Sequence, residues 1–245
     1  MSHSEEPVQA AAAKAALAWL HTARFLTTAS QLDQLPVSEL PEIAFVGRSN
    51  AGKSTAINML AQQKRLAFAS RTPGRTQHIN LFELGPKTGA DALFADLPGY
   101  GYAAVARGAK LRWQQVMADY LAVRRNLAGV VLMVDSRLGF TDLDRRLLDY
   151  IAPRLASGTV ALLVLLTKAD KLNRREADQS LASVQQELAA RATDETDLSV
   201  TLFSALSRRG LDDAAEVLEQ WVRRGTATAV AVAPQDTLPP GMSQP

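Results

Sequence analysis

The sequence contains no cysteine and only three histidines, His3, His21 and His78, which lie far apart along the chain. Without cysteine there can be no disulfide and no thiolate chemistry, and a reducing compartment fits this composition. Histidines this scattered do not indicate a zinc site. Disulfide-stapled domains, zinc-thiolate proteins and cysteine-dependent enzymes are therefore excluded.

Long hydrophobic runs are also missing. The longest ones, "AGVVLMV" and "ALLVLL", fall far short of the about 20 residues that a helix needs to cross a bilayer. The first residues, "MSHSEEPVQ", are acidic, whereas a secretory signal peptide begins with basic residues. We therefore expect a soluble, cytoplasmic protein that has no membrane partner.

Hydrophobic residues make up 47% of the 245 residues, which is enough for a sizeable core in one domain with extensions. The formal net charge of +2 and the pI near 9.0 permit a nucleic-acid partner without requiring one. Apolar, strand-like runs alternate with helical segments along most of the chain. This alternation predicts an α/β fold with a mostly parallel six-stranded sheet, one antiparallel edge strand and helices on both faces.

The chain divides into three parts by composition. Residues 1–40 are expected to form a helical extension, in which the Ala-rich stretch Ala11–Ala29 is one helix. This helix either packs on the domain or serves as a membrane or partner helix. Residues 41–224 form the domain itself. Residues 225–245 are rich in small residues and proline, and we expect them to be a disordered tail.

A glycine-rich motif predicts where phosphates bind. The segment "GRSNAGKS" fits G-x-x-x-x-G-K-[ST] and lies between a strand-like run and a helix, which is the setting of a P-loop NTPase. Backbone N–H groups and the helix N-terminus would donate to phosphate oxygens. Lys53 would reach the β- and γ-phosphates, and the Ser54 hydroxyl would ligate Mg²⁺. The predicted phosphate-binding residues are Gly47, Arg48, Ser49, Asn50, Ala51, Gly52, Lys53 and Ser54.

A second phosphate element follows another apolar strand, in "DALFADLPGYG". The carboxylate of Asp96 can hold Mg²⁺ through water, and the N–H of Gly99 can bond a γ-phosphate oxygen. Alone, D-x-x-G often marks an ordinary turn, but here it lies about 40 residues after a P-loop. We therefore include Asp96, Leu97, Pro98 and Gly99 in the predicted site.

The run "LLVLLTKAD" predicts the base that is bound. A carboxylate at Asp170 can accept from both N1–H and the exocyclic amine of guanine, whereas adenine lacks that pair of donors. Sites of this kind can reject the wrong partner by roughly 10⁴-fold. The stem of Lys168 can lie over the base plane, and the N–H of Ala205 could bond guanine O6. The predicted base-binding residues are Thr167, Lys168, Ala169, Asp170, Phe203, Ser204 and Ala205.

Taken together, these motifs resemble those of translation-factor-type GTPases. More narrowly, "VGRSNAGKST", "TPGRTQHINLFEL", "DLPGYGYA", "LLTKADKL" and "LFSAL" resemble the EngB/YihA/YsxC family of ribosome-biogenesis GTPases, within the TrmE-Era-EngA-EngB-Septin-like superfamily. The resemblance covers about residues 24–224. It implies a G domain that binds GTP or GDP with Mg²⁺ and hydrolyses GTP.

The resemblance also implies a first switch segment, made of Gly74, Arg75, Thr76, Gln77 and His78. Thr76 would be the second protein ligand of Mg²⁺ beside Ser54. His78 stands where relatives often carry leucine, and we interpret it as a partly exposed edge position rather than a functional histidine. The residues implied in catalysis are Lys53, Asn50, Thr76 and Gly99.

Slow intrinsic hydrolysis is expected because the sequence differs from Ras-like proteins at one position of the site. Ras-like proteins place a water-orienting glutamine just after the D-x-x-G glycine, and here that position is Tyr100. A phenol placed there cannot mimic a carboxamide that both donates and accepts toward the water. Asn50 offers an alternative, because P-loops of this form resemble those that bind K⁺ beside the phosphates. K⁺ is therefore a candidate cofactor, and the ribosome is a candidate activator.

The family resemblance implies a role in assembly of the large (50S) ribosomal subunit and a link to cell division and septation. The basic residues Lys64, Arg65, Arg71 and Arg75 either contact rRNA phosphates or form a solvated loop. We expect a monomer. Two other classes remain: a P-loop kinase, which "TKAD" and the lack of an Arg-rich lid disfavour, and a nucleotide-stabilised scaffold or regulator of the division machinery.

Overall fold

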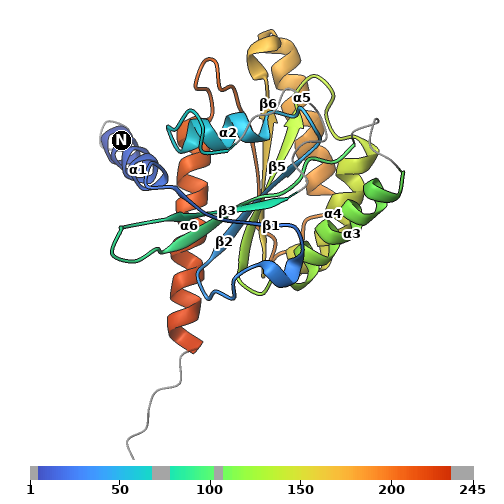
Figure 1. The fold of residues 1–245 in the computed structure, drawn as a ribbon. Helices are drawn as coiled ribbons and strands as arrows, with labels where there is room; N and C mark the ends of the chain where they lie inside the picture. Colours follow the sequence, from blue (N-terminus) through green and yellow to red (C-terminus); the bar gives the residue numbers. More distant parts are fainter. Residues whose placement is uncertain (1–4, 68–77, 102–106, 233–245) are drawn as a thin grey trace, which may run out of the picture.

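The fold is known from a computed structural model, which describes residues 5–67, 78–101 and 107–232. A single seven-stranded sheet runs through the described part, in the order β1-β3-β4-β2-β5-β6-β7 (Figure 1). Strands β2, β4, β5, β6 and β7 pair in parallel, and β3 runs antiparallel to both of its neighbours. The strands are β1 (Arg24–Ala29), β2 (Glu42–Gly47), β3 (Ile79–Leu84), β4 (Ala92–Asp96), β5 (Leu127–Asp135), β6 (Ala161–Thr167) and β7 (Leu198–Leu202).

The predicted α/β fold is confirmed, but the prediction of six strands is wrong. The seventh is β1, which lies inside the stretch Ala11–Ala29 that we expected to be entirely helical. Helix α1 (Glu5–Leu20) ends earlier, and β1 pairs antiparallel with β3. Phe25 and the β-branched Thr27 and Thr28 favour a strand there. The antiparallel strand β3 is therefore not the edge, because β1 extends the sheet beyond it.

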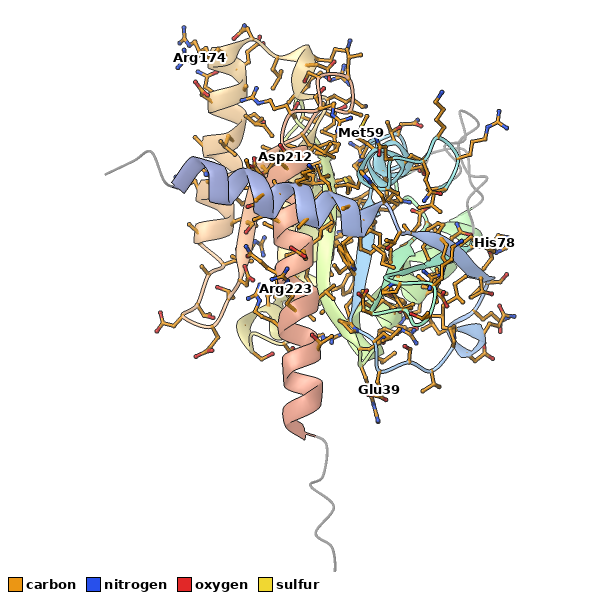
Figure 2. The ribbon with its side chains drawn as sticks, turned by 90° about the vertical axis from the view of Figure 1, so that its left-hand side faces the viewer. Glu39, Met59, His78, Arg174, Asp212 and Arg223 are labelled. Carbon is orange, nitrogen blue, oxygen red and sulfur yellow. The ribbon has the colours of Figure 1, made fainter. Side chains whose placement is uncertain are left out.

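Helices cover both faces of the sheet, as expected. Helices α3 (Arg107–Val123), α4 (Asp142–Ala156) and α5 (Arg174–Ala189) pack on one face. Helices α1, α2 (Lys53–Leu60) and α6 (Leu211–Val232) pack on the other. Figure 2 shows α1 lying across α6.

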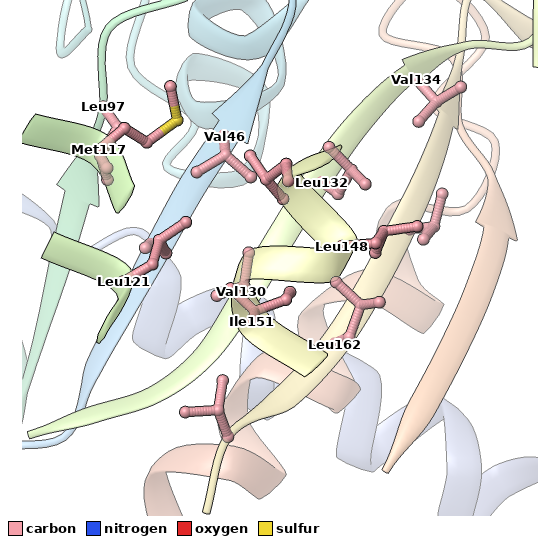
Figure 3. Packing of buried hydrophobic residues seen from close by; sticks show 14 of the residues in the cluster. Val46, Leu97, Met117, Leu121, Val130, Leu132, Val134, Leu148, Ile151 and Leu162 are labelled. Carbon is pink, nitrogen blue, oxygen red and sulfur yellow. The ribbon is translucent and has the colours of Figure 1, made fainter. Parts of the chain in front are cut away.

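The central strand β5 is buried on both sides, which explains its uninterrupted apolar sequence. Val130, Leu132 and Val134 point toward α3 and α4, where they pack against Leu148 and its neighbours (Figure 3). The alternate residues of the strand belong to the opposite core. Because side chains alternate along a strand, one apolar run supplies two cores.

The last helix is longer than the sequence predicts. Helix α6 continues without a break past Gly225, where we expected a disordered tail, and ends at Val232. Its last turns extend beyond the end of the sheet (Figure 1). Residues 233–245 of the predicted tail lie outside the described residues. Among the described helices, none is both long and apolar enough to cross a membrane.

Candidate functional site

The P-loop connects β2 to α2 at the carboxyl end of the parallel strands, where ligands bind in open α/β sheets. Asn50 and Gly52 have φ angles of 66° and 94°, so the chain turns through the left-handed region twice before the helix begins. At Gly47 the loop touches the neighbouring strand, because an added Cβ would lie 2.8 Å from the Cβ of Met133. A residue with a side chain would push the loop off β5 at this point.

Lys53 and Asp96 form a buried ion pair beneath this loop, with side chains 8% and 1% exposed. Lys53 is the first residue of α2, and Asp96 is the last residue of β4. The structure therefore brings the two predicted phosphate elements into direct contact. Ser54, the predicted Mg²⁺ ligand, is the next residue of α2 and is half-buried.

The D-x-x-G loop lies along the P-loop and bonds to it through the backbone. The N–H of Tyr100 donates to Gly47 O (3.2 Å), and the N–H of Ser49 donates to Tyr100 O (2.8 Å). Gly99 lies so close that an added Cβ would be 3.1 Å from Ser49. The N–H of Leu97 donates to the carbonyl oxygen of Phe45 in β2 (3.1 Å), and Pro98 connects Leu97 to Gly99. Backbone hydrogen bonds therefore hold the two loops against each other.

The side chain of Tyr100 is directed away from the phosphate elements. Its hydroxyl donates to Asp144 Oδ1 in helix α4 at 2.6 Å, and Tyr100 is only 7% exposed. Burial, followed by the negative charge of Asp144, raises the pKa of Tyr100 well above its usual value. The other oxygen of Asp144 accepts from the N–H and the hydroxyl of Thr141 at the start of α4. The sequence offered no motif that connects Tyr100 with Asp144.

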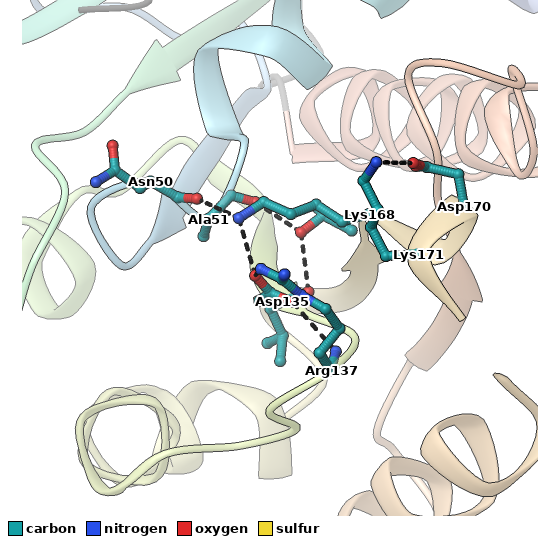
Figure 4. A network of polar contacts seen from close by, with 9 residues as sticks. Asn50, Ala51, Asp135, Arg137, Lys168, Asp170 and Lys171 are labelled. Atoms are coloured by element: carbon teal, nitrogen blue, oxygen red, sulfur yellow. Dashed lines mark hydrogen bonds and ion pairs between the residues drawn. The ribbon is translucent and has the colours of Figure 1, made fainter. Parts of the chain in front are cut away.

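The strand that carries "TKAD" is tied to the P-loop by two side chains (Figure 4). Thr167 Oγ1 donates to the carbonyl oxygen of Ala51 (2.6 Å), and the carbonyl oxygen of Val134 lies 3.1 Å from the same hydroxyl. Lys168 Nζ donates to the carbonyl oxygen of Asn50 at 2.8 Å. The predicted phosphate end and the predicted base end therefore form one continuous site.

Asp170 receives a hydrogen bond that the sequence analysis missed. Ser204 Oγ donates to Asp170 Oδ1 at 2.7 Å, and Ser204 is itself completely buried. This bond is the main reason that the pKa of Asp170 lies below its usual value. The backbone N–H groups of Leu206 and Ser207 donate to Ser204 Oγ, which orients the hydroxyl toward Asp170. In "FSA", the serine thus positions the carboxylate that is predicted to read the base.

Ala169 joins the two base-binding loops, because its N–H donates to the carbonyl oxygen of Phe203 at 3.1 Å. Phe203 is buried and Ala205 is half-buried beside it. Both predicted base loops therefore meet at one place.

Another carboxylate, Asp135 at the end of β5, was also missed. It accepts from Lys168 Nζ (2.8 Å) and from the guanidinium of Arg137 (2.7 and 2.9 Å). Burial raises the pKa of Asp135, but the bonds from Arg137 and Lys168 outweigh burial and hold the pKa well below its usual value. The only signal in the sequence was an acidic residue closing an apolar run.

Of the predicted first switch, His78 falls within the described residues. Gly74, Arg75, Thr76 and Gln77 lie outside the described residues. His78 is exposed just before β3, which is not at the edge of the sheet, and its Nδ1 lies 2.8 Å from the hydroxyl of Ser30. No group of three or more histidine, aspartate or glutamate residues suited to a metal occurs in the described part of the chain.

This fold and site define a class, the P-loop GTPases. A family model described as "50S ribosome-binding GTPase" matches residues 42–168. Curated relatives have the same name, "Probable GTP-binding protein EngB". The protein from Albidiferax ferrireducens is 57% identical over 87% of this chain and 100% of its own length. The one from Polaromonas sp. is 58% identical over 90% of this chain and 88% of its own length. The chain belongs to the EngB family of GTP-binding GTPases.

Solved structures share the fold at lower identity. A "probable GTP-binding protein engB" superposes with a TM-score of 0.54 at 21% identity, covering 75% of this chain and 99% of that one. The structure of Era with MgGDPNP and part of 16S ribosomal RNA gives a TM-score of 0.57 at 21% identity, covering 74% and 56%. At such identities the likeness concerns the fold alone.

Proposed function

We propose that this GTPase is a switch in the assembly of the large ribosomal subunit and hydrolyses GTP slowly. The observation that carries the nucleotide part is the junction at Lys168, where the base-reading strand end bonds the phosphate loop at Asn50. The ribosomal part is supported by the matching family description, "50S ribosome-binding GTPase". We attribute the link to cell division and septation to ribosome supply rather than to a second chemistry.

The residues of the site fit a Mg²⁺–nucleotide complex. Mg²⁺ is held in proteins by one or two oxygen ligands, with phosphates and water completing its shell. The Ser54 hydroxyl would be a direct ligand, and Asp96 would act through water. When bound, Mg²⁺ supplies charge neutralisation between the β- and γ-phosphates. Lys53 adds its own positive charge there, and the Gly99 N–H would report whether the γ-phosphate is present.

Slow hydrolysis is supported by the position of the Tyr100 side chain. Its hydroxyl donates to Asp144 and therefore cannot orient an attacking water. The described atoms nearest to an added Cβ at Gly99 belong to Ser49, which has no carboxamide. Charge must then come from elsewhere, and we propose K⁺ bound beside Asn50, activation by the ribosome, or both.

An RNA contact is supported by exposed basic residues next to the first switch. Lys64 and Arg65 are exposed and lead directly into residues 68–77. Era, a protein with this fold, binds part of 16S ribosomal RNA in its solved complex. Phosphate contacts through lysine and arginine release counterions, so binding should weaken steeply as salt rises.

The test is sedimentation with separated ribosomal subunits through a sucrose cushion. GDP and a non-hydrolysable GTP analogue would be compared at two salt concentrations. The proposal expects binding to the large subunit alone, dependent on the analogue and weakened by salt. Lys64→Glu should weaken binding to the large subunit further. Lys87→Glu, which reverses the charge of an exposed lysine on the β3–β4 turn, should leave that binding unchanged. Binding to neither subunit in either state would refute the ribosomal role and leave the GTPase assignment standing.

A further inference from the structure

Asp135 is tied into the site by four hydrogen bonds. Its Oδ1 accepts from the backbone N–H of Arg137 (3.1 Å) and from Arg137 Nε (2.9 Å). Its Oδ2 accepts from Arg137 Nη2 (2.7 Å) and Lys168 Nζ (2.8 Å). The carboxylate is 10% exposed and cannot turn without breaking several of these bonds. Asp135 thus presents a fixed negative charge to Lys168 (Figure 4).

Lys168 is held at both ends. Its backbone adopts a left-handed conformation with φ of 59°, which fixes where the side chain leaves the strand end. Its ammonium lies between two acceptors, Asp135 Oδ2 and the carbonyl oxygen of Asn50, each 2.8 Å away. A lysine stem has four flexible carbons, and an ordered stem costs conformational entropy. Because both acceptors are fixed, the Lys168 side chain is already ordered before a nucleotide binds.

The carbonyl group that Lys168 bonds belongs to a strained part of the P-loop. Asn50 has a φ of 66°, a conformation that is uncommon outside glycine. The neighbouring Ala51 carbonyl is held by Thr167, so the two side chains brace successive peptide groups of the loop. If Lys168 were fixed less firmly, both the P-loop and the base-binding end of β6 would become less rigid.

We propose that Asp135 is a positioning residue for nucleotide binding. Acting through Lys168, it locks the base-binding end of β6 onto the phosphate-binding loop. Arg137 fixes the carboxylate from the other side: its guanidinium donates to both oxygens of Asp135, while its own side chain remains 49% exposed. This inference rests on the proposed assignment of Thr167–Asp170 to the guanine base.

The experiment is a double-mutant cycle read out as GDP and GTP affinity. Asp135→Asn removes the charge but keeps the shape, and it should weaken GDP and GTP equally, by roughly tenfold, as expected for a hydrogen bond between charged groups. Lys168→Met keeps the apolar stem and removes the ammonium. In the Lys168→Met background, Asp135→Asn should change affinity by less than about twofold, because its target is gone.

The matched control is Asp149→Asn, which breaks an exposed ion pair with Arg191 on the outside of α4 and should leave affinity unchanged. A merely structural role for Asp135 would lower affinity in both backgrounds by the same factor, and that result would overturn the proposal. Unchanged affinity in the single Asp135→Asn variant would overturn it as well. If Asp135→Asn does not fold, Asp135→Glu moves the carboxylate by one methylene and should give the same dependence on Lys168.

A parallel measurement on Asp170→Asn separates this inference from the assignment on which it rests. Loss of GDP affinity in Asp170→Asn with no loss in Asp135→Asn would refute the positioning role alone. No loss in Asp170→Asn would refute the assignment of the base site, and the proposed role of Asp135 would fall with it.

Discussion

Replacing Tyr100 by phenylalanine should destabilise the protein without slowing its chemistry. Tyr100 follows the D-x-x-G glycine, where a Ras-like protein would place a water-orienting glutamine. In this fold its hydroxyl is engaged 2.6 Å from Asp144 in helix α4, and both residues are buried. The substitution removes one oxygen atom and leaves the ring in place, so it tests the hydrogen bond alone.

The expected loss follows from the burial and charge of the partner. A hydrogen bond to a charged group contributes about 1.5–3 kcal/mol. Asp144 keeps two bonds from Thr141 on its other oxygen, so only one side of the carboxylate is left without a partner. We therefore expect a loss of about 2 kcal/mol in the free energy of unfolding. In a protein of this size that corresponds to a fall in melting temperature of roughly 4–8 °C.

The assay compares thermal unfolding and single-turnover GTP hydrolysis in the wild type and Tyr100→Phe. Tyr150→Phe is the matched control, because Tyr150 lies on the same helix α4 with 56% of its surface exposed. The control should change the free energy of unfolding by less than about 0.5 kcal/mol. Hydrolysis should stay within about threefold of the wild type in both variants, a change of less than about 1 kcal/mol in the barrier.

Two results would refute this reasoning. An unchanged melting temperature for Tyr100→Phe would mean that the bond to Asp144 contributes nothing to stability. A fall in hydrolysis of more than about tenfold with unchanged stability would mean that the phenol acts on the reacting groups. In that case the explanation given for slow turnover would be wrong.

Three further predictions concern the base, the cation and the core. Asp170→Asn should weaken GTP binding roughly a hundredfold or more and strengthen XTP binding, since the amide can donate to the C2 carbonyl of XTP. Both affinities are measured by competition, and unchanged GTP affinity would contradict the base assignment. Hydrolysis in K⁺ should exceed that in Na⁺ at equal ionic strength, and Asn50→Ala should abolish the difference; equal rates would remove Asn50 from that role. Gly129→Ala should lower the free energy of unfolding by about 1–3 kcal/mol, because the added Cβ would lie 2.1 Å from the ring of Trp221. An unchanged free energy of unfolding would contradict this packing.

The local motifs were predictable because their chemistry depends on neighbouring residues in the chain. A P-loop needs glycine and lysine at fixed spacing so that successive N–H groups face one anion, and that spacing is visible in the letters. The apolar runs of β5 and β6 likewise indicate strands buried on both faces. The α/β architecture and the adjacency of the phosphate and base elements follow from them, since parallel strands end at the same edge of the sheet.

Strand β1 shows why the fold was predicted incompletely. Its sequence continues an Ala-rich helical pattern, and its pairing partner, β3, lies 50 to 59 residues further along the chain. Local propensity between helix and strand is weak there, so the available sheet edge decides the outcome. The length of α6 was missed for a related reason. Glycine and small residues suggested a tail, but the helix continues through Gly225, which packs beside Pro41.

The sequence by itself determined the family of GTP-binding proteins and the places of its loop motifs, because those motifs are short segments of fixed spacing. Only the tertiary structure decided how the loops are held. Ser204 reaches Asp170, Asp135 reaches Lys168, and Tyr100 turns its hydroxyl to helix α4. Each of these bonds joins residues more than 30 positions apart. No local pattern encodes such pairs, because folding alone brings their strand ends and helices within hydrogen-bonding distance.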